Sequence, residues 1–444
     1  TRSGRASASS PPRPGIAFRD PLPLDRDTPG RVAVVARPTP VIPRIRHRHP
    51  DDHPRMLHHA TDPRSADDAN RLTATQRDAN CRRLGLIFGD QLDYASPLLD
   101  ELDPEQDAIL MMEVAEEAEH VPSHRQRTAL FLAAMRHYAL DLLDAGWRVR
   151  YVQLNHPSNT YSFDGEYARA LDALRPERVL AVHPGEHRIA RKLDAWRRDH
   201  EPPVDILPDT HFLSTLEEFA DWAADRKELV LEYFYRTMRR KHDVLLTREG
   251  KPVGGTWNLD KQNRETFGKD GPPALGRERL TFDPDPLTEQ VIRLVDRHFA
   301  EAWGRLDHFH WPVTRAQALD ALDHFLHHRL PLFGDYQDAM WTDEPFLFHS
   351  TLSPLLNLKL LHPREVLERT LAHAEDHDIP LNCLEGFVRQ ILGWREFIRD
   401  VYWYEGPDYV DRNALGQHGT LPDFYWTGDT DMACMAQSLG QVVE

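Results

Sequence analysis

Short apolar runs alternate with helical-period segments between residues 84 and 210. The continuous run at residues 84–88 is typical of a strand that is buried on both faces of a parallel sheet. Further runs of this kind lie at residues 108–114, 148–154, 178–182 and 204–207. The segments between them carry apolar residues at helical spacing, at residues 125–145, 163–174 and 186–198. Strands that alternate with helices predict a doubly wound, Rossmann-like parallel sheet with helices on both faces.

The pattern changes after this α/β domain, which we assign to residues 84–210. Residues 211–300 mix helical segments with a loop rich in Gly and Asn, and we expect them to be an inter-domain connector. Residues 301–444 are helical in pattern, rich in aromatic residues and His, and contain no convincing strand. The predicted fold class is therefore α/β plus all-α.

Residues 1–83 differ from the rest in charge and composition. They hold 16 Arg, no Lys, 9 Asp and no Glu, a net charge of +7, so the remainder carries -24 of the total of -17. They also hold 12 of the 34 prolines and little apolar periodicity, so they bury too little surface to offset chain entropy. We expect a disordered leader, or sequence outside the functional product, because the chain does not begin with Met. A nucleic-acid-binding basic tail is the alternative.

The compartment follows from three further features. No run of eighteen apolar residues is present, which argues against a membrane partner. Three widely spaced cysteines, Cys81, Cys383 and Cys434, do not form a disulfide framework, and the start does not resemble a signal peptide. We therefore expect a soluble, cytoplasmic protein.

The first candidate ligand site lies where the first predicted strand ends. Ligands of open α/β sheets bind outside the carboxyl ends of the strands. There Gly89 would let a ligand approach the backbone, while Asp90 and Gln91 offer hydrogen-bonding groups. Glu113 and Glu117 would point toward the same crevice from the second strand. The alternative is a plain turn in which Asp90 caps the next segment.

The connector contains aromatic residues interleaved with cations. Tyr233, Phe234 and Tyr235 precede four cationic residues, Arg236, Arg239, Arg240 and Lys241. Such a segment suits contacts with a phosphate backbone supported by stacking, which favours nucleic-acid binding. An amphipathic helix with a solvated basic face is the alternative.

Two segments of the helical part carry further candidate chemistry. Residues 349–354 place an imidazole and three hydroxyls at an expected helix start, where hydroxyl and backbone N–H groups could hold a pyrophosphate. Plain N-capping is the alternative. Farther on, Gln390, Trp394 and Phe397 are spaced to share one helix face, although the two aromatic residues could equally be core residues.

These segments resemble the cryptochrome/photolyase family. Residues 385–390 with the Trp-Arg-Glu-Phe sequence at 394–397 resemble the family's flavin-side helix, and residues 350–354 resemble its pyrophosphate-binding stretch. Four more segments are similar to the bacterial iron–sulfur branch, the prokaryotic (6-4) photolyases, at residues 89–92, 232–236, 254–258 and 424–428. The resemblance covers residues 84–444.

The resemblance implies three cofactors: FAD, a [4Fe-4S] cluster and a lumazine-type antenna chromophore. The antenna contacts that it implies are Asp90, Gln91 and Glu117. The FAD contacts that it implies are His349, Ser350, Leu352, Ser353 and Arg395. Gln390 would face the lesion, Trp426 would be the outer member of an electron-transfer relay, and Cys434 would be the first cluster ligand.

The implied function is light-driven repair of UV-damaged DNA by a monomer. A (6-4) photoproduct would be flipped out of the duplex and would receive an electron from excited reduced FAD. The family's other cluster ligands and its catalytic histidine would follow Glu444, so we expect a C-terminally truncated chain that is inactive alone. Repair of cyclobutane dimers, a cryptochrome-like photoreceptor and a non-catalytic remnant that binds only the antenna stay open at this point.

Overall fold

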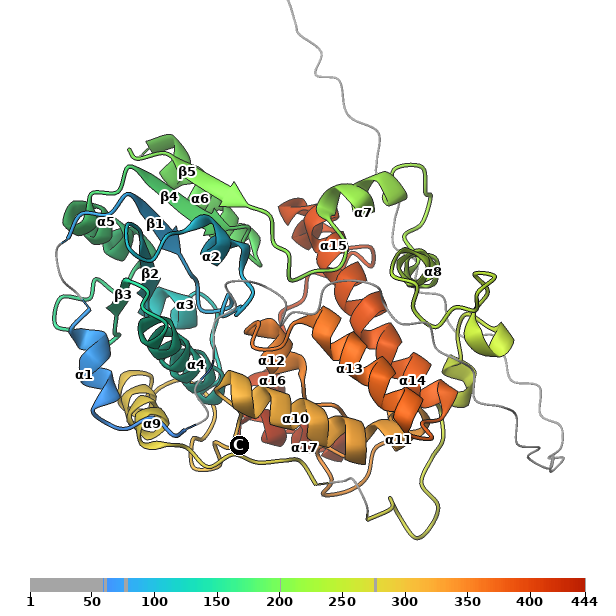
Figure 1. The fold of residues 1–444 in the computed structure, drawn as a ribbon. Coiled ribbons are helices and arrows are strands. Elements are labelled where there is room, and N and C mark those ends of the chain that lie inside the picture. The colour runs from blue at the N-terminus through green and yellow to red at the C-terminus, as the bar shows by residue number, and fades with distance from the viewer. Residues whose placement is uncertain (1–58, 60–61, 76–78, 200, 275–277, 444) are drawn as a thin grey trace, which may run out of the picture.

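The computed structural model describes residues 59, 62–75, 79–199, 201–274 and 278–443, and shows a parallel sheet packed against an array of helices (Figure 1). The sheet contains β1 (Arg83–Leu86), β2 (Ala108–Met112), β3 (Val149–Val152), β4 (Arg178–Val182) and β5 (Val204–Leu207). All neighbouring strands are parallel, in the order β3-β2-β1-β4-β5. The order reverses beside β1, so a topological switch point lies between the ends of β1 and β4. The predicted doubly wound sheet is confirmed.

Helices cover both faces of this sheet, and the two faces bury different residues. Alternate strand residues face opposite cores, for example Ile109 and Met111 on one face against Leu110 and Met112 on the other. The second core is closed by α5 (Phe163–Leu174) and α6 (His187–Asp199). The first core is continuous with the helical part, so the two parts share one hydrophobic interior.

Helix α4 (Arg125–Asp144) lies at the junction of the two parts. Every residue from Thr128 to Leu142 is buried, because the sheet packs on one side of the helix and α9 (Pro286–His298) on the other. A helix that is covered all round needs no polar face. Its burial holds the carboxyl edge of the sheet against the helical part.

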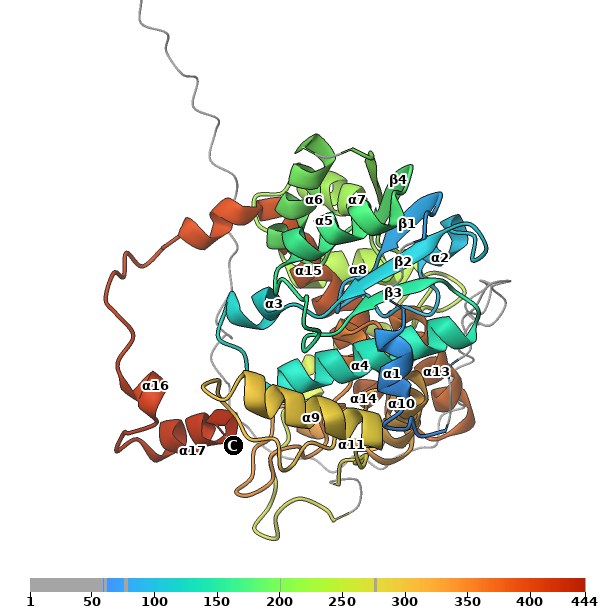
Figure 2. The ribbon, with the colours of Figure 1, turned by 90° about the vertical axis from the view of Figure 1, so that its left-hand side faces the viewer.

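The helical part confirms the expected all-α pattern, and its segments fall into three groups. Around the connector lie α7 (Leu216–Ala223), α8 (Leu231–Lys241) and the 3-10 turns Val253–Gly255 and Asp260–Gln262. The body contains α10 (Arg315–His328), α11 (Leu330–Tyr336), α12 (Ser353–Asn357), α13 (Pro363–Asp376), α14 (Leu381–Val388), a π-helical segment (Arg389–Arg395) and α15 (Glu396–Glu405). A 3-10 turn (Pro407–Asp411), α16 (Phe424–Thr427) and α17 (Ala433–Val443) follow, and Figure 2 shows α16 and α17 at the end of a long connection on one side of the molecule.

The structure corrects the expected leader at its end. Residues 62–75 include α1 (Asp68–Thr73), whose Leu72 is fully buried in the shared core. Arg64 pairs with Asp141 at 2.5 Å and with Asp144 at 2.7 Å, both on α4. These partners are distant in sequence, so local composition did not reveal them. Residues 1–58, 60–61 and 76–78 of the expected leader lie outside the described residues.

Two short helices complete the α/β part, α2 (Pro97–Glu101) and α3 (Ala115–Glu119).

Across the described part of the chain, no helix combines the length and the apolar character that a membrane crossing requires.

Candidate cofactor site

A cavity of about 1800 Å³ opens between the carboxyl edge of the sheet and the helical part. From the sheet it is lined by residues that follow β1 and β4, including Gly89, Asp90 and Gly185. From the helical part it is lined by Ser350, Ser353, Gln390, Trp394 and Arg395. The cavity therefore brings together residues for which the sequence predicted contacts with an antenna, with FAD and with the lesion. It lies at the switch point, where open α/β sheets bind ligands.

Two carboxylates define the sheet end of the cavity. Burial raises the pKa of Asp90 to about 6, with Glu117 acting in the same direction and Lys359 opposing it. The backbone of Gly185 lies so close that a Cβ there would be 2.8 Å from Asp90 Oδ2. Glu117, from α3, pairs with Arg188. This end can accept hydrogen bonds from a ligand that carries N–H groups.

Gln91 and Glu113 do not reach this space as predicted. Gln91 is buried, and its Nε2 donates to the carbonyls of Val182 and His183, so it joins the ends of β1 and β4. Glu113 is buried in a bidentate pair with Arg136, at 2.7 and 2.9 Å. Both side chains therefore hold the sheet together, and the prediction that they contact a ligand is wrong.

A buried ion pair forms part of the wall between the two ends of the cavity. Lys359 Nζ donates to Asp209 Oδ1 at 2.9 Å, and both side chains are buried. Asp209 follows β5, and Lys359 follows α12, so the pair ties the α/β part to the helical part. A buried charge without its counterion is strongly unfavourable. Because the two residues must stay in contact, the pair fixes the relative position of the two walls.

The helical end of the cavity is polar around the start of α12. Ser350 and Ser353 line the cavity, and together with His349 and Gln390 they also line a side pocket of about 440 Å³. Burial, followed by the nearby Arg329 guanidinium, lowers the pKa of His349. The side chain of Leu352 is buried in the core, so only its backbone is left to contact a ligand, which corrects that prediction.

Arg279 supplies a cation that the sequence pattern did not single out. Its guanidinium lies 4.2 Å from the ring of Trp311 and 4.6 Å from that of Phe346, inside the cavity. Its Nε and Nη1 atoms are buried and have no hydrogen-bond partner among the residues that the structure describes. Burial and the charge of Arg279 lower the pKa of the neighbouring Arg329 to about 10. Two guanidinium groups that are buried near each other favour the binding of an anionic ligand, because the anion neutralises their charge.

The Arg389–Arg395 segment is π-helical, which changes the expected helix face. Gln390 and Trp394 line the cavity, whereas Phe397 packs in the core against Phe219 and Phe234. A π-helical turn holds more residues than an α-helical one, so a side chain seven positions after Gln390 no longer falls on the face that Gln390 and Trp394 share. The prediction that all three side chains share a face is wrong for Phe397.

Arg395 lines the cavity but is already engaged. Its guanidinium lies 3.9 Å from the ring of Phe212, and it donates to Glu396 Oε1 at 2.9 Å. Glu396 is fully buried and accepts from the backbone N–H groups of Leu213 and Ser214. The Arg-Glu pair of the Trp-Arg-Glu-Phe sequence therefore anchors α15 to the segment after β5.

The basic segment of α8 divides between the core and the surface. Arg239 is buried and donates to the carbonyls of Val244, Leu245 and Trp257, so the prediction that it contacts DNA is wrong. Arg236 pairs with Glu232, and Lys241 pairs with Glu218. Arg240 is exposed, and its guanidinium lies 4.5 Å from the ring of Trp257.

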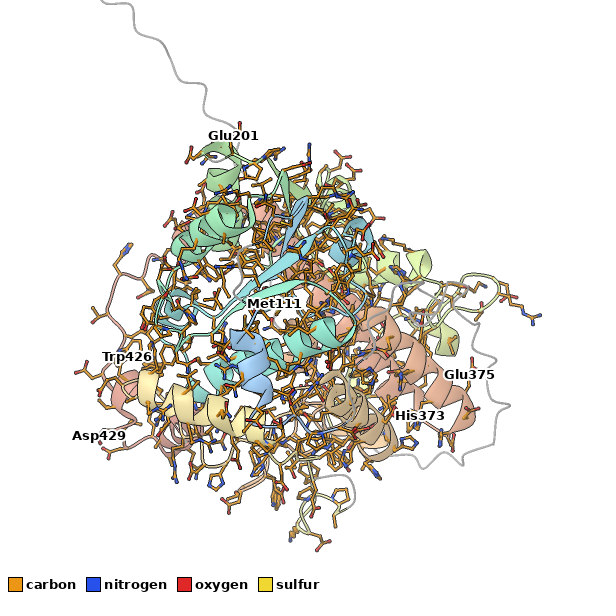
Figure 3. The ribbon with its side chains drawn as sticks, turned by 60° about the vertical axis from the view of Figure 1, so that its left-hand side comes forward. Met111, Glu201, His373, Glu375, Trp426 and Asp429 are labelled. Carbon is orange, nitrogen blue, oxygen red and sulfur yellow. The ribbon has the colours of Figure 1, made fainter. Side chains whose placement is uncertain are left out.

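Neither Trp426 nor Cys434 lines the cavity, although Gln441 and Val442, farther along α17, do. Trp426 is exposed on α16 at the edge of the molecule, where its ring lies 5.7 Å from that of Trp303 (Figure 3). Cys434 is exposed on α17, whereas burial raises the pKa of Cys81 and of Cys383 to about 11. A [4Fe-4S] cluster needs four thiolates. The described residues do not fit such a cluster.

The fold and cavity define a protein with an α/β domain and a helical domain that enclose one large ligand site between them. The family model for deoxyribodipyrimidine photo-lyase-related protein matches residues 85–311, and the chain belongs to this family. A (6-4) photolyase of Agrobacterium fabrum is 43% identical over 362 residues, which cover 82% of this chain and 71% of that protein.

Two further similarities are more limited. An uncharacterised protein of Acanthamoeba polyphaga mimivirus is 36% identical over 96 residues, 21% of this chain and 73% of that protein. The crystal structure of a bacterial class III photolyase from Agrobacterium tumefaciens superimposes with a TM-score of 0.50 at 14% identity, covering 82% of this chain and 68% of that one. This structural likeness supports the fold.

Proposed function

We propose that the protein is a light-driven DNA photolyase that repairs (6-4) photoproducts with FAD bound in the domain-spanning cavity. The observation that carries the proposal is that residues from both domains converge on one cavity of about 1800 Å³. They include Arg279, whose buried Nε and Nη1 have no hydrogen-bond partner among the described residues. The similarity to a protein named (6-4) photolyase supports this lesion class, and it favours repair over the photoreceptor alternative.

The residues around the cavity fit FAD. Arg279 would neutralise a phosphate through its two unpartnered nitrogens, and the hydroxyls of Ser350 and Ser353 would add hydrogen bonds to the pyrophosphate. Phe333, Phe346 and Trp394 provide apolar walls for a planar ring system. When bound, the flavin supplies the light absorption and the electron for repair.

Gln390 is the residue that we assign to the lesion. Its amide lies on the cavity wall and offers both a donor and an acceptor, which suits the edge of a base that has been flipped out of the duplex. The exposed cations Arg240 and Lys241 on α8, with exposed Tyr233, would contact the DNA backbone. The acidic total charge does not exclude a DNA partner, because Arg240 and Lys241 lie exposed next to each other on this helix.

The proposed repair activity is tested with the chain loaded with FAD, and the same assay decides between this proposal and the expectation, drawn from the sequence, of a chain that is inactive alone. It should restore an oligonucleotide containing one (6-4) photoproduct under blue light and not in the dark. Gln390→Ala should lower the repair rate about tenfold, because one hydrogen-bonding partner of the flipped base is lost, with FAD content unchanged. Gln262→Ala, at an exposed position away from the cavity lining, is the matched control. Absence of light-dependent repair in the FAD-loaded wild type would overturn the proposal.

Asp90 and Glu117 would hold an antenna chromophore of the lumazine type at the sheet end. Because the pKa of Asp90 is raised to about 6, its carboxylate is ionised at pH 7 and becomes protonated as the pH falls below 6. Protonation removes an acceptor for the imide N–H of a lumazine. We therefore expect lumazine affinity to fall between pH 7 and pH 5.

Fluorescence titration of the chromophore against pH measures this effect, with Asp90→Asn as the comparison. The variant should bind more weakly at pH 7, and its affinity should change less with pH. A wild type whose affinity is the same at both pH values would contradict the role of Asp90.

A further inference from the structure

Three histidine side chains from two helices converge away from the cavity. His327 lies near the end of α10, whereas His373 and His377 lie at the carboxyl end of α13. One ring nitrogen from each lies within 4.8 Å of one from each of the others. Figure 3 shows His373 near the edge of the helical part, and none of the three side chains lines the cavity.

Hydrogen bonds fix which nitrogen is free on two of the rings. His327 Nδ1 lies 2.8 Å from the carbonyl of Asp323, and His377 Nδ1 lies 2.9 Å from the carbonyl of His373. A carbonyl only accepts, so each Nδ1 carries the proton and donates it. Each Nε2 is then left with a lone pair. Histidines that bind metals are oriented in this way, with one ring nitrogen donating to a carbonyl or carboxylate.

The spacing of the rings also suits a metal ion. His373 and His377 are four residues apart and therefore lie on the same side of α13, where their rings stack with centroids 3.9 Å apart. His327 faces them from α10, with its ring centroid 4.5 Å from that of His373. Three nitrogens around a tetrahedral ion lie about 3.3 Å apart for metal–nitrogen distances near 2.0 Å. Rotation of the exposed side chains of His327 and His377 would close the remaining gap.

Two carboxylates, those of Asp323 and Asp376, lie near enough to His373 to act on it, although Asp323 is also paired with Arg369 at 3.3 Å. The carboxyl end of α13 adds the partial negative charge of a helix terminus. No second set of three such ligands was found among the described residues.

We propose that His327, His373 and His377 bind a divalent transition-metal ion such as Zn²⁺. Three imidazole nitrogens are a ligand set that such ions accept, with a fourth position left to water or to another ligand. The ion would join α10 to α13 and would stabilise the helical part at a distance from the cavity. This inference does not depend on the proposed repair activity.

The test is a Zn²⁺ titration of the full chain, purified without a polyhistidine tag and stripped of metal with a chelator. Equilibrium dialysis should show one ion bound with a Kd below about 10 μM, and saturating Zn²⁺ should raise the thermal midpoint by several degrees. His327→Gln and His377→Gln change exposed residues and should each weaken binding at least tenfold. In both variants the rise of the midpoint should be lost.

His328→Gln is the matched control, because His328 is exposed and adjacent to His327 but is not one of the three proposed ligands. Its ring centroid lies 4.6 Å from that of His324 and 6.4 Å from that of His327. This variant should bind Zn²⁺ like the wild type. A wild type that binds no Zn²⁺ below about 100 μM would overturn the proposal. Unchanged binding in both His327→Gln and His377→Gln, or an equal loss in His328→Gln, would overturn it as well.

Discussion

Replacing Arg279 by Gln should lower the affinity for FAD by about 10- to 150-fold. A hydrogen bond that involves a charged group contributes about 1.5–3 kcal/mol, and each 1.4 kcal/mol changes affinity tenfold. Two guanidinium nitrogens of Arg279 are buried and have no hydrogen-bond partner in the part of the chain that the structure describes, so a phosphate would gain both. The measurement is a titration of flavin-free protein with FAD, followed by flavin fluorescence.

The free energy of unfolding without FAD separates this role from a structural one. Since no described residue accepts from these two nitrogens, Arg279→Gln should leave that free energy unchanged or raise it. Arg293→Gln, on the exposed face of α9, is the control and should change neither quantity. Unaltered FAD affinity in Arg279→Gln would show that the guanidinium does not bind the cofactor.

Replacing Glu396 by Gln should lower the free energy of unfolding by about 3 kcal/mol, because a buried charge is left without its partner. Glu396 accepts from Leu213 N at 2.7 Å, from Ser214 N at 2.9 Å and from Arg395 at 2.9 Å. A glutamine amide has one acceptor oxygen where the carboxylate has two, so it cannot accept from all of these donors. The Arg395 guanidinium would stay buried without its counterion. Urea denaturation of the two proteins measures the difference.

Glu289→Gln is the matched control for this substitution. Glu289 pairs with Arg293 at 3.2 Å, but both side chains are more than half exposed, so the change should be below about 0.5 kcal/mol. A loss in Glu396→Gln no larger than in Glu289→Gln would contradict the anchoring role of Glu396. Both predictions together separate the residues that hold the fold from those that bind the ligand.

The α/β half could be predicted because its signals are local. Five apolar runs mark five strands, and the segments between them supply the crossover helices. The end of β1 was recognised as a ligand site from Gly89 and Asp90, because parallel sheets bind ligands at that edge.

The errors came from contacts and backbone geometry that the pattern of apolar and charged residues does not show. Arg239 looks like a surface cation beside Arg240, but it donates to the carbonyls of Val244 and Leu245, just after α8, and to that of Trp257. Helix α1 is stabilised by carboxylates on α4 that no local pattern connects with Arg64. The π-helical turn moved Phe397 away from the face of Gln390.

Arg279 was missed for a similar reason. It lies outside regular secondary structure, and its neighbours in sequence give no sign of a ligand. Only the packing of Trp311 and Phe346 around its guanidinium makes it a buried cation in the cavity. A sequence pattern shows that an arginine is present, but it does not show whether the side chain has a partner.

The most direct test of the proposed flavin site is a crystal structure of the chain with FAD. We expect flavin density in the domain-spanning cavity, with the phosphates within hydrogen-bonding distance of Arg279 and near the start of α12. Flavin density at any other place in the molecule, or an Arg279 that does not contact FAD, would contradict the site proposed for it.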